Sequence, residues 1–361
     1  KINFVSKSHP INKNELMELR KIGMNFIALN QKIGQRLDVL VFVSSPNLPF
    51  KKFNKTKKEK FIYFYFTEYV NEKKHWSELF SKINANIYLT SHKWDTHTIA
   101  AAAAMNEKGG ISAVFQSSYY EFPVVYYSIY TDINFSFSRT APMIEMKQGS
   151  KIKYNICIGN LAHSGNKIFK EEAKTLRKRL HSFGAKKIIS YFDQGPLPDQ
   201  KWGTSRANVL ESYQYLLSKV IQEKWLGLII KPKKPKNIRK VLGDINSLLE
   251  QALATGRCYL FENHGNFSSK NFENPPALSA MASDIAIQEE MMAGTAGIEA
   301  VLTGTPTLMM DRYGFKESQF YKLGVGKVVF NDWSSLWENL ERHWKKEPIT
   351  GFGDWSSIID D

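Results

Sequence analysis

Apolar positions along this chain form two successive series of strand and helix patterns. In the first series, five consecutive alanines within residues 96–105 predict a helix, because alanine has the highest intrinsic helix propensity. Gly109 and Gly110 predict the end of that helix. Continuous or alternating apolar runs predict strands at residues 61–66, 86–90, 111–116, 132–138 and 154–158.

A second series begins after residue 160 with a polar helix at residues 170–182, which ends before Gly184. The spacing that follows is typical of a parallel sheet with helices on both faces. Predicted strands are residues 187–192, 226–230, 258–261, 284–287, 307–310 and 327–330. Further predicted helices are residues 207–223, 238–254 and 297–303.

We therefore expect an α/β protein of two Rossmann-like, doubly wound domains that face a cleft. The expected boundary divides an N-terminal domain, residues 1–162, from a C-terminal domain, residues 163–361. A helix at about 334–346 carries Leu336, Trp337 and Leu340 on one face, and we expect it to pack back on the N-terminal domain.

The formal net charge of +14 indicates attraction to an anionic partner, either a phosphorylated substrate or an anionic membrane surface. No nucleic-acid-binding signature accompanies that charge, so we expect no nucleic-acid partner. No apolar stretch approaches the ~20 residues that span a bilayer, and residues 1–13 lack the apolar core of a signal peptide. We expect a cytoplasmic protein. Cys157 and Cys258 lie in apolar runs and are expected to be buried thiols.

The segment 294–306 is the strongest candidate for ligand binding. Its predicted helix opens on the small residues Gly294, Thr295, Ala296 and Gly297. Such a start lets a phosphate approach backbone N–H groups at the positive end of the helix dipole. Glu299 has no capping-box partner, since Ala296 stands where Ser or Thr would be needed. Its carboxylate could hold a ribose diol, or it could be a surface residue on a tightly packed short helix.

This segment resembles the donor half of GT-B glycosyltransferases. In many of them a Gly- or Ser/Thr-rich turn opens a short helix, a glutamate follows, and Gly-x-Pro closes the unit, as residues 304–306 do here. The resemblance implies that Thr295, Ala296 and Gly297 face a diphosphate and that Glu299 holds the ribose. It also fits the order of the predicted sheets, except over the first 60 residues. Sugar-nucleotide 2-epimerases and teichoic-acid-type glycerol-phosphate polymerases share this architecture.

Other loops of the second half follow predicted strands, where ligands bind in open parallel sheets. The donor-binding candidates there are Asp193, Gln194, Lys231, Lys233, Asn263 and His264. Lys231 could neutralise a diphosphate leaving group, or the lysines could form a solvated basic turn. Asn263 and His264 could contact the base or the sugar. For Asp193 an Asx-type turn is the favoured alternative.

Two loops of the first half offer groups for the acceptor. His92 and Asp95 follow a predicted strand, and either could deprotonate an acceptor hydroxyl. Asp95 also directly precedes a predicted helix, and an N-cap is the favoured interpretation. The next loop supplies acceptor-binding candidates and a reserve catalytic base, namely Gln116, Ser117 and Tyr119, and Glu121.

These features predict a GT-B-type glycosyltransferase of cell-surface polysaccharide or lipopolysaccharide synthesis, with a nucleotide sugar as donor and a glycan or lipid-linked acceptor. GT-B enzymes generally need no bound metal, so we expect no metal and no cofactor beyond the donor. A lipid-linked acceptor would bring the basic surface to the inner face of the cytoplasmic membrane. A sugar-nucleotide 2-epimerase, a glycerophosphotransferase and a non-catalytic nucleotide- or sugar-binding module are the alternatives.

Overall fold

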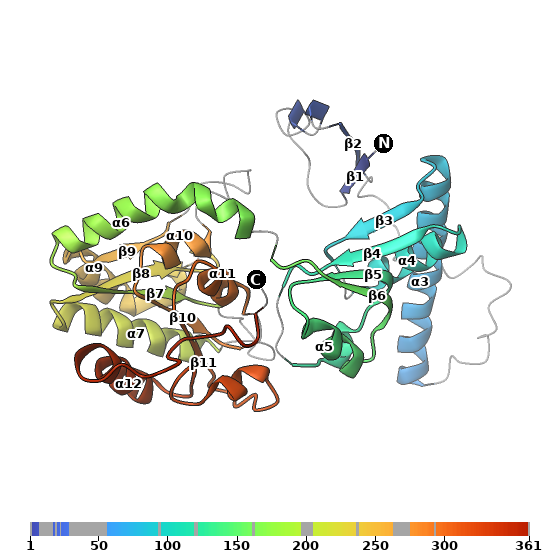
Figure 1. The fold of residues 1–361 in the computed structure, drawn as a ribbon. Coiled ribbons are helices and arrows are strands. Elements are labelled where there is room, and N and C mark those ends of the chain that lie inside the picture. The colour runs from blue at the N-terminus through green and yellow to red at the C-terminus, as the bar shows by residue number, and fades with distance from the viewer. Residues whose placement is uncertain are drawn as a thin grey trace. The chain divides into compact units, whose positions relative to one another are not determined.

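A computed structural model describes residues 2–6, 17–18, 20–21, 23–28, 56–92, 95–118, 122–160, 163–195, 205–235, 238–262, 275–291 and 294–359. These residues form an α/β protein built on parallel sheets (Figure 1). A parallel pair, β1 (Ile2–Ser6) and β2 (Met24–Ala28), belongs to one compact unit, and the two larger sheets belong to another.

The first large sheet contains four parallel strands that lie in sequence order. They are β3 (Ile87–Thr90), β4 (Ile111–Phe115), β5 (Tyr130–Ser136) and β6 (Lys151–Cys157). The helices of this part are α3 (Lys57–Lys82), α4 (Thr96–Glu107) and α5 (Ala141–Lys147). In the core, Trp76 and Phe80 of α3 contact the ring of Tyr88 on β3, and four of the five consecutive alanines of α4 are almost fully buried. Aromatic rings and alanines thus make up much of the core of this half, together with Met105, Val114 and Ile144.

The second large sheet has six strands in the order β12-β11-β10-β7-β8-β9. Their bounds are β7 (Lys187–Phe192), β8 (Leu226–Lys231), β9 (Cys258–Leu260), β10 (Ile285–Glu289), β11 (Thr307–Met310) and β12 (Val329–Phe330). Counted from β7, this is the 3-2-1-4-5-6 order of doubly wound folds, in which the strand order reverses between β7 and β10. Ligands bind such sheets at that reversal, outside the carboxyl ends of the strands.

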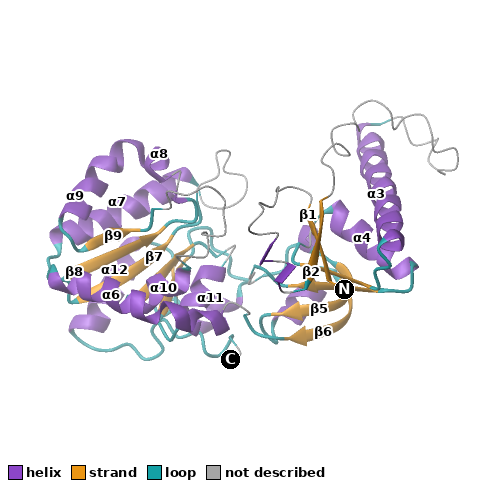
Figure 2. Cartoon of the chain, turned by 90° about the horizontal axis from the view of Figure 1, so that it is seen from above, coloured by secondary structure: helices purple, strands orange, loops and turns teal. Residues whose placement is uncertain are grey.

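Helices cover both faces of the second sheet (Figure 2). On one face, Tyr191 packs among α7 (Arg206–Gln222), α9 (Asn246–Ala254) and α12 (Trp333–Lys345). On the other, Ile188 packs against α6 (Lys170–Ser182) and α10 (Pro276–Met281). The remaining helices are α8 (Ile238–Leu242) and α11 (Thr295–Leu302). The apolar face of α12 is thus buried in the core of the second half.

Most predicted elements are confirmed with shifts of a few residues, but the strand predicted at residues 61–66 is wrong. These residues lie in α3, and the signal for that helix was present just before it. The backbone N–H of Thr56 donates to Glu59 at 2.8 Å and the N–H of Glu59 donates to the Thr56 hydroxyl at 3.2 Å, which is a capping box. Phe61 is 63% exposed, whereas a strand covered on both faces would bury it.

Two further expectations change. The helix predicted over residues 238–254 is interrupted at Gly243, whose φ of +53° does not fit a continuous α-helix. Cys258 is buried as expected, but Cys157 is exposed.

The domain boundary between residues 162 and 163 stays a prediction. Within the described parts of the chain, every helix is too short or too polar to cross a bilayer.

Candidate functional site

Three charged side chains from separate parts of the chain interact at the carboxyl edge of the second sheet. Asp193 follows β7, Lys231 ends β8, and Glu299 lies in the middle of α11, which follows β10. Burial lowers the pKa of the Lys231 ammonium group, and the carboxylates of Asp193 and Glu299 partly oppose that shift. In the sequence these three residues are only separate candidates. In the structure they share one edge of the sheet, which is the position where doubly wound folds bind ligands.

Asp193 connects two of these strand ends. Its side chain is 5% exposed, and its Oδ1 accepts a 2.6 Å hydrogen bond from the backbone N–H of Lys233 while its Oδ2 accepts one of 2.8 Å from the Tyr213 hydroxyl. Burial raises the pKa of Asp193, and these donors and the neighbouring lysines oppose that shift. Both carboxylate oxygens of Asp193 thus accept hydrogen bonds within the protein. This favours a role in positioning the loop after β8 over direct contact with a nucleotide-sugar donor.

Lys231 at the end of β8 is half-buried, whereas Lys233 and Lys234 in the turn that follows are exposed. Burial lowers the pKa of Lys233 as it does that of Lys231. The ammonium group of Lys233 donates to the Gln194 side chain at 3.0 Å, so these two predicted donor-binding residues contact each other. A partly desolvated lysine interacts more strongly with an anion than a fully hydrated one, because less water screens the charge.

The carboxylate of Glu299 is mostly buried, and only one of its two oxygens has a hydrogen-bond partner among the described residues. Its carboxylate accepts a hydrogen bond from the backbone N–H of Ala277, in the first turn of α10. Burial raises the pKa of Glu299 to about 7, although this N–H and the charge of Lys231 act in the opposite direction. Its Oε2 is buried and has no hydrogen-bond partner among the described residues. One oxygen thus caps α10, and the other is left for a hydroxyl donor.

Gly297 has a packing role that the sequence did not reveal. A Cβ at this position would come within 2.5 Å of the ring of Trp355, which is fully buried. The N–H of Gly297 donates to the Gln288 side chain at 2.9 Å. Because this N–H already donates to Gln288, it is not free for a phosphate. The predicted phosphate site is therefore left with the preceding residues, Gly294, Thr295 and Ala296.

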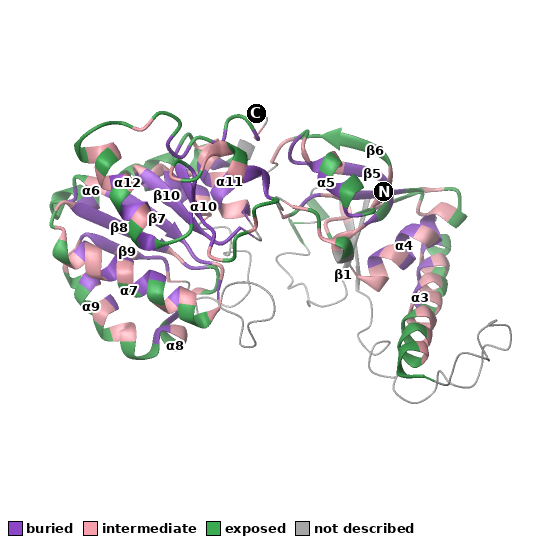
Figure 3. Ribbon diagram, turned by 90° about the horizontal axis from the view of Figure 1, so that it is seen from below, coloured by how far each residue is buried: buried purple, intermediate pink, exposed green. Residues whose placement is uncertain are grey.

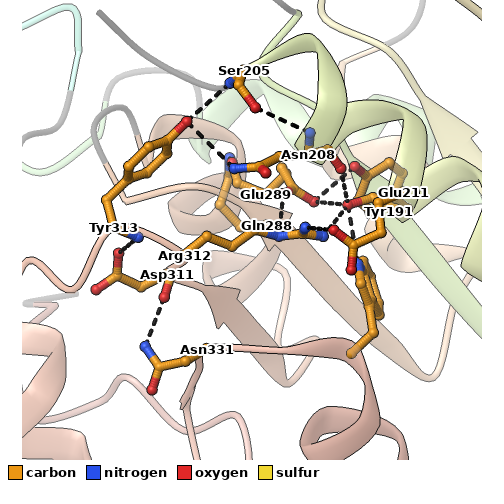
Figure 4. A network of polar contacts seen from close by, with 12 residues as sticks. Tyr191, Ser205, Asn208, Glu211, Gln288, Glu289, Asp311, Arg312, Tyr313 and Asn331 are labelled. Atoms are coloured by element: carbon orange, nitrogen blue, oxygen red, sulfur yellow. Dashed lines mark hydrogen bonds and ion pairs between the residues drawn. The ribbon is translucent and has the colours of Figure 1, made fainter.

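Sequence reasoning missed a buried polar network beside this edge (Figure 4). Glu289, at the end of β10, is 1% exposed, and its Oε2 accepts hydrogen bonds of 2.8 Å from the hydroxyls of Tyr191 and Ser212. Its Oε1 lies 3.4 Å from the Nε of Arg312, whose guanidinium also donates to Ser212 at 2.7 Å. The next residue, Glu290, is buried with a φ of +71°. The available signal was the pair of acidic residues at the end of an apolar strand.

In the first half, two of the predicted catalytic residues, His92 and Asp95, lie in contact. The Nε2 of His92 is 3.2 Å from Asp95 Oδ2, and the other oxygen of Asp95 accepts the N–H of Thr98 at 2.7 Å as the N-cap of α4. The favoured N-cap interpretation is confirmed, and the same carboxylate also orients the histidine. Such a His–Asp pair can act as a general base.

The side chains of two acceptor-binding candidates, Gln116 and Ser117, form hydrogen bonds to the protein's own backbone. Gln116 is buried, and its side chain accepts the N–H of Phe137 at 2.8 Å and donates to the carbonyl of Ser118 at 3.0 Å. It therefore has a structural role in the strand-end loop. The hydroxyl of Ser117 donates to the carbonyl of Ser91 at 3.1 Å and links this loop to the one that carries His92.

Four predicted site residues lie outside the described residues, namely Tyr119, Glu121, Asn263 and His264. Across the part of the chain that is described, no group of His, Cys, Asp and Glu side chains could hold a metal ion.

No protein-family model matches the chain, and no curated protein sequence matches it. Solved structures do. The S. aureus MnaA–UDP co-structure matches with a TM-score of 0.52 and 14% identity, over 98% of this chain and 92% of that one. The putative UDP-N-acetylglucosamine 2-epimerase from Listeria monocytogenes matches with a TM-score of 0.51 and 16% identity, over 94% of this chain and 85% of that one. At this identity the likeness shows the fold alone, and it confirms the predicted GT-B-like α/β architecture.

Proposed function

We propose that the chain is an enzyme that binds a nucleotide sugar at the carboxyl edge of its second sheet. One observation carries the proposal: the carboxylate of Glu299 interacts with the charge of Lys231 and has a buried oxygen without a hydrogen-bond partner among the described residues. A ribose hydroxyl would satisfy that oxygen, and Lys231 would neutralise the diphosphate. The UDP in the S. aureus co-structure, which has the same fold, makes a uridine diphosphate sugar the first donor to test.

Two reactions fit this site. In glycosyl transfer, the His92–Asp95 pair takes the proton of an acceptor hydroxyl, the sugar carbon bonds to the acceptor oxygen, and the diphosphate leaves with its negative charge next to Lys231. The second candidate is epimerisation of the bound sugar, which needs no acceptor. It is favoured by the likeness to the putative UDP-N-acetylglucosamine 2-epimerase, while the aspartate-held histidine favours transfer to a hydroxyl.

Calorimetry with UDP, CMP, GDP and dTDP tests the binding site. We expect UDP to bind and Glu299→Ala to weaken it by at least about tenfold, the effect of losing a hydrogen bond to a charged group. Glu172→Ala, an exposed glutamate on α6, is the matched control and should leave the affinity unchanged. The proposal fails if no nucleotide binds, or if Glu299→Ala binds UDP as the wild type does.

The reaction is then followed with UDP-N-acetylglucosamine, with and without a panel of glycan acceptors. Appearance of the C2 epimer without an acceptor identifies the epimerase. Release of UDP that depends on an acceptor identifies the transferase. Binding of the nucleotide sugar without turnover under either condition would favour the non-catalytic nucleotide- or sugar-binding module.

A further inference from the structure

The first turns of α3 expose an unusual apolar surface. Along this helix, residues at spacings of three and four share one face, and that face buries Trp76 and Phe80 in the core of the first large sheet. The same face continues toward the N-terminus of the helix to Phe61 and Tyr65. At this end of α3 the residues are exposed (Figure 3).

Four large apolar side chains make up this surface, and they are Phe61, Ile62, Phe64 and Tyr65, exposed by 63%, 64%, 62% and 45%. Three of them form an aromatic cluster, with ring centroids 4.7 Å apart for Phe61 and Tyr65 and 5.4 Å apart for Phe64 and Tyr65. Scattered apolar residues on a surface need no explanation, but a contiguous patch of this kind marks an interaction site.

The charges beside the patch indicate what kind of partner it fits. Lys57, Lys58 and Lys60 are exposed in the turn that precedes the aromatic residues. Lysine is depleted at the centres of protein–protein interfaces. In contrast, aromatic rings at headgroup level with lysines directed toward anionic lipids are typical of helices that lie on a bilayer surface.

From this combination we propose that residues 57–65 of α3 dock the protein on an anionic lipid bilayer. The capping box of Thr56 and Glu59 forms the start of the helix without a membrane, so little ordering is needed on contact. Phe61 and Phe64 enter the interface and the lysines contact the anionic headgroups. The proposal does not depend on nucleotide binding.

Co-sedimentation of the full chain with vesicles tests the charge contribution. We expect binding to vesicles of phosphatidylcholine with phosphatidylglycerol and much weaker binding to phosphatidylcholine alone. Lys57→Glu/Lys58→Glu/Lys60→Glu should lower the affinity by at least about a hundredfold, since each basic residue near an anionic leaflet contributes roughly fivefold. Lys170→Glu/Lys178→Glu/Lys224→Glu changes three exposed lysines of the second half by the same net charge and should lower it much less. Equal losses in the two triple variants would overturn the proposal, since they would indicate attraction by the net charge alone.

The aromatic contribution is tested with Phe61→Ser/Phe64→Ser, and Met146→Ser/Ile168→Ser is the control at apolar residues that are also exposed. We expect the first pair to weaken vesicle binding by about tenfold or more and to leave the melting temperature and the mass in solution unchanged. A lower melting temperature with unchanged vesicle binding would show that the patch is covered by another part of this chain. A change from dimer to monomer would show that it is covered by a second copy. Either result overturns the proposal.

Discussion

The carboxylate of Asp193 accepts a 2.6 Å hydrogen bond from the backbone N–H of Lys233, and this contact joins the chain after β7 to the chain after β8. Lys231 is the last residue of β8, two positions before this contact, so the bond restrains the backbone that carries Lys231. Asp193 is therefore a positioning residue of the candidate site, and its negative charge also helps to keep Lys231 protonated.

Asp193→Asn should change the pH dependence of UDP binding. The amide oxygen can still accept the N–H of Lys233, but the negative charge that raises the pKa of Lys231 is lost. Lys231 then loses its proton at a lower pH, so the affinity for UDP should fall at a lower pH than in the wild type, while uridine, which lacks phosphate, should show no such shift. Tyr213→Phe removes one hydrogen bond to Asp193 and keeps the charge. If the two variants share one pH profile, Asp193 acts only through the fold.

Glu299→Gln should make stability less sensitive to pH. The ordinary pKa of 4.5 is raised to about 7 in the folded chain, so between these values the unfolded state releases a proton that the folded state keeps. The wild type thus loses stability relative to the variant as pH rises through this window, by roughly 3 kcal/mol once above pH 7. Urea unfolding from pH 4 to pH 8.5, in steps of about half a unit, measures the difference. A constant difference over this range would contradict the shifted pKa.

Gly297→Ala should destabilise the protein although alanine favours helices. The new Cβ would lie 2.5 Å from the buried ring of Trp355, and such overpacking costs about 1–3 kcal/mol. Trp355→Phe shortens that ring, so the same glycine substitution should cost less in its background. Thermal unfolding of the four proteins in this double-mutant cycle gives the coupling, and strictly additive effects would mean that the contact with Trp355 is not the reason for the glycine.

Arg312→Met should leave the Glu289 carboxylate buried without its cation. Removing one partner of a buried ion pair costs about 3–5 kcal/mol, because the remaining charge has lost its solvation. In a Glu289→Gln background there is no such charge, and the arginine substitution should cost clearly less. Chemical denaturation measures both steps, and an equal cost in the two backgrounds would show that Arg312 stabilises the fold through its other contacts.

Asp95→Asn and Asp95→Ala should separate catalysis from capping. Asparagine can still cap α4 through the N–H of Thr98, but it removes the carboxylate that contacts His92. We expect Asp95→Asn to lower turnover by about a hundredfold with little change in stability. Asp95→Ala should lower turnover similarly and destabilise by about 1 kcal/mol more. Unchanged turnover in Asp95→Asn would remove the His92–Asp95 pair from the mechanism.

Sequence patterns predicted the second sheet well because its strands are continuous apolar runs buried on both faces. They failed at residues 61–66, where the same continuity occurs in a helix, and only the spacing of Thr56 and Glu59 distinguished the two. The edge of the second sheet was predicted as a set of loops, but the contact of Asp193 with Lys233 depends on which strands are neighbours. The pairs Glu289–Arg312 and Gly297–Trp355 join residues that are distant along the chain or carry no local signal, so only the folded structure reveals them.

The unequal environments of the two cysteines give the protein a natural attachment point for a reporter group. Burial raises the pKa of Cys258 to about 12, so at neutral pH it stays a protonated, inaccessible thiol. Cys157 is exposed at the end of β6 and is open to reagents. A single fluorophore or spin label can therefore be placed on the unmodified sequence, in the first half of the chain, whereas Lys231 and Glu299 belong to the second.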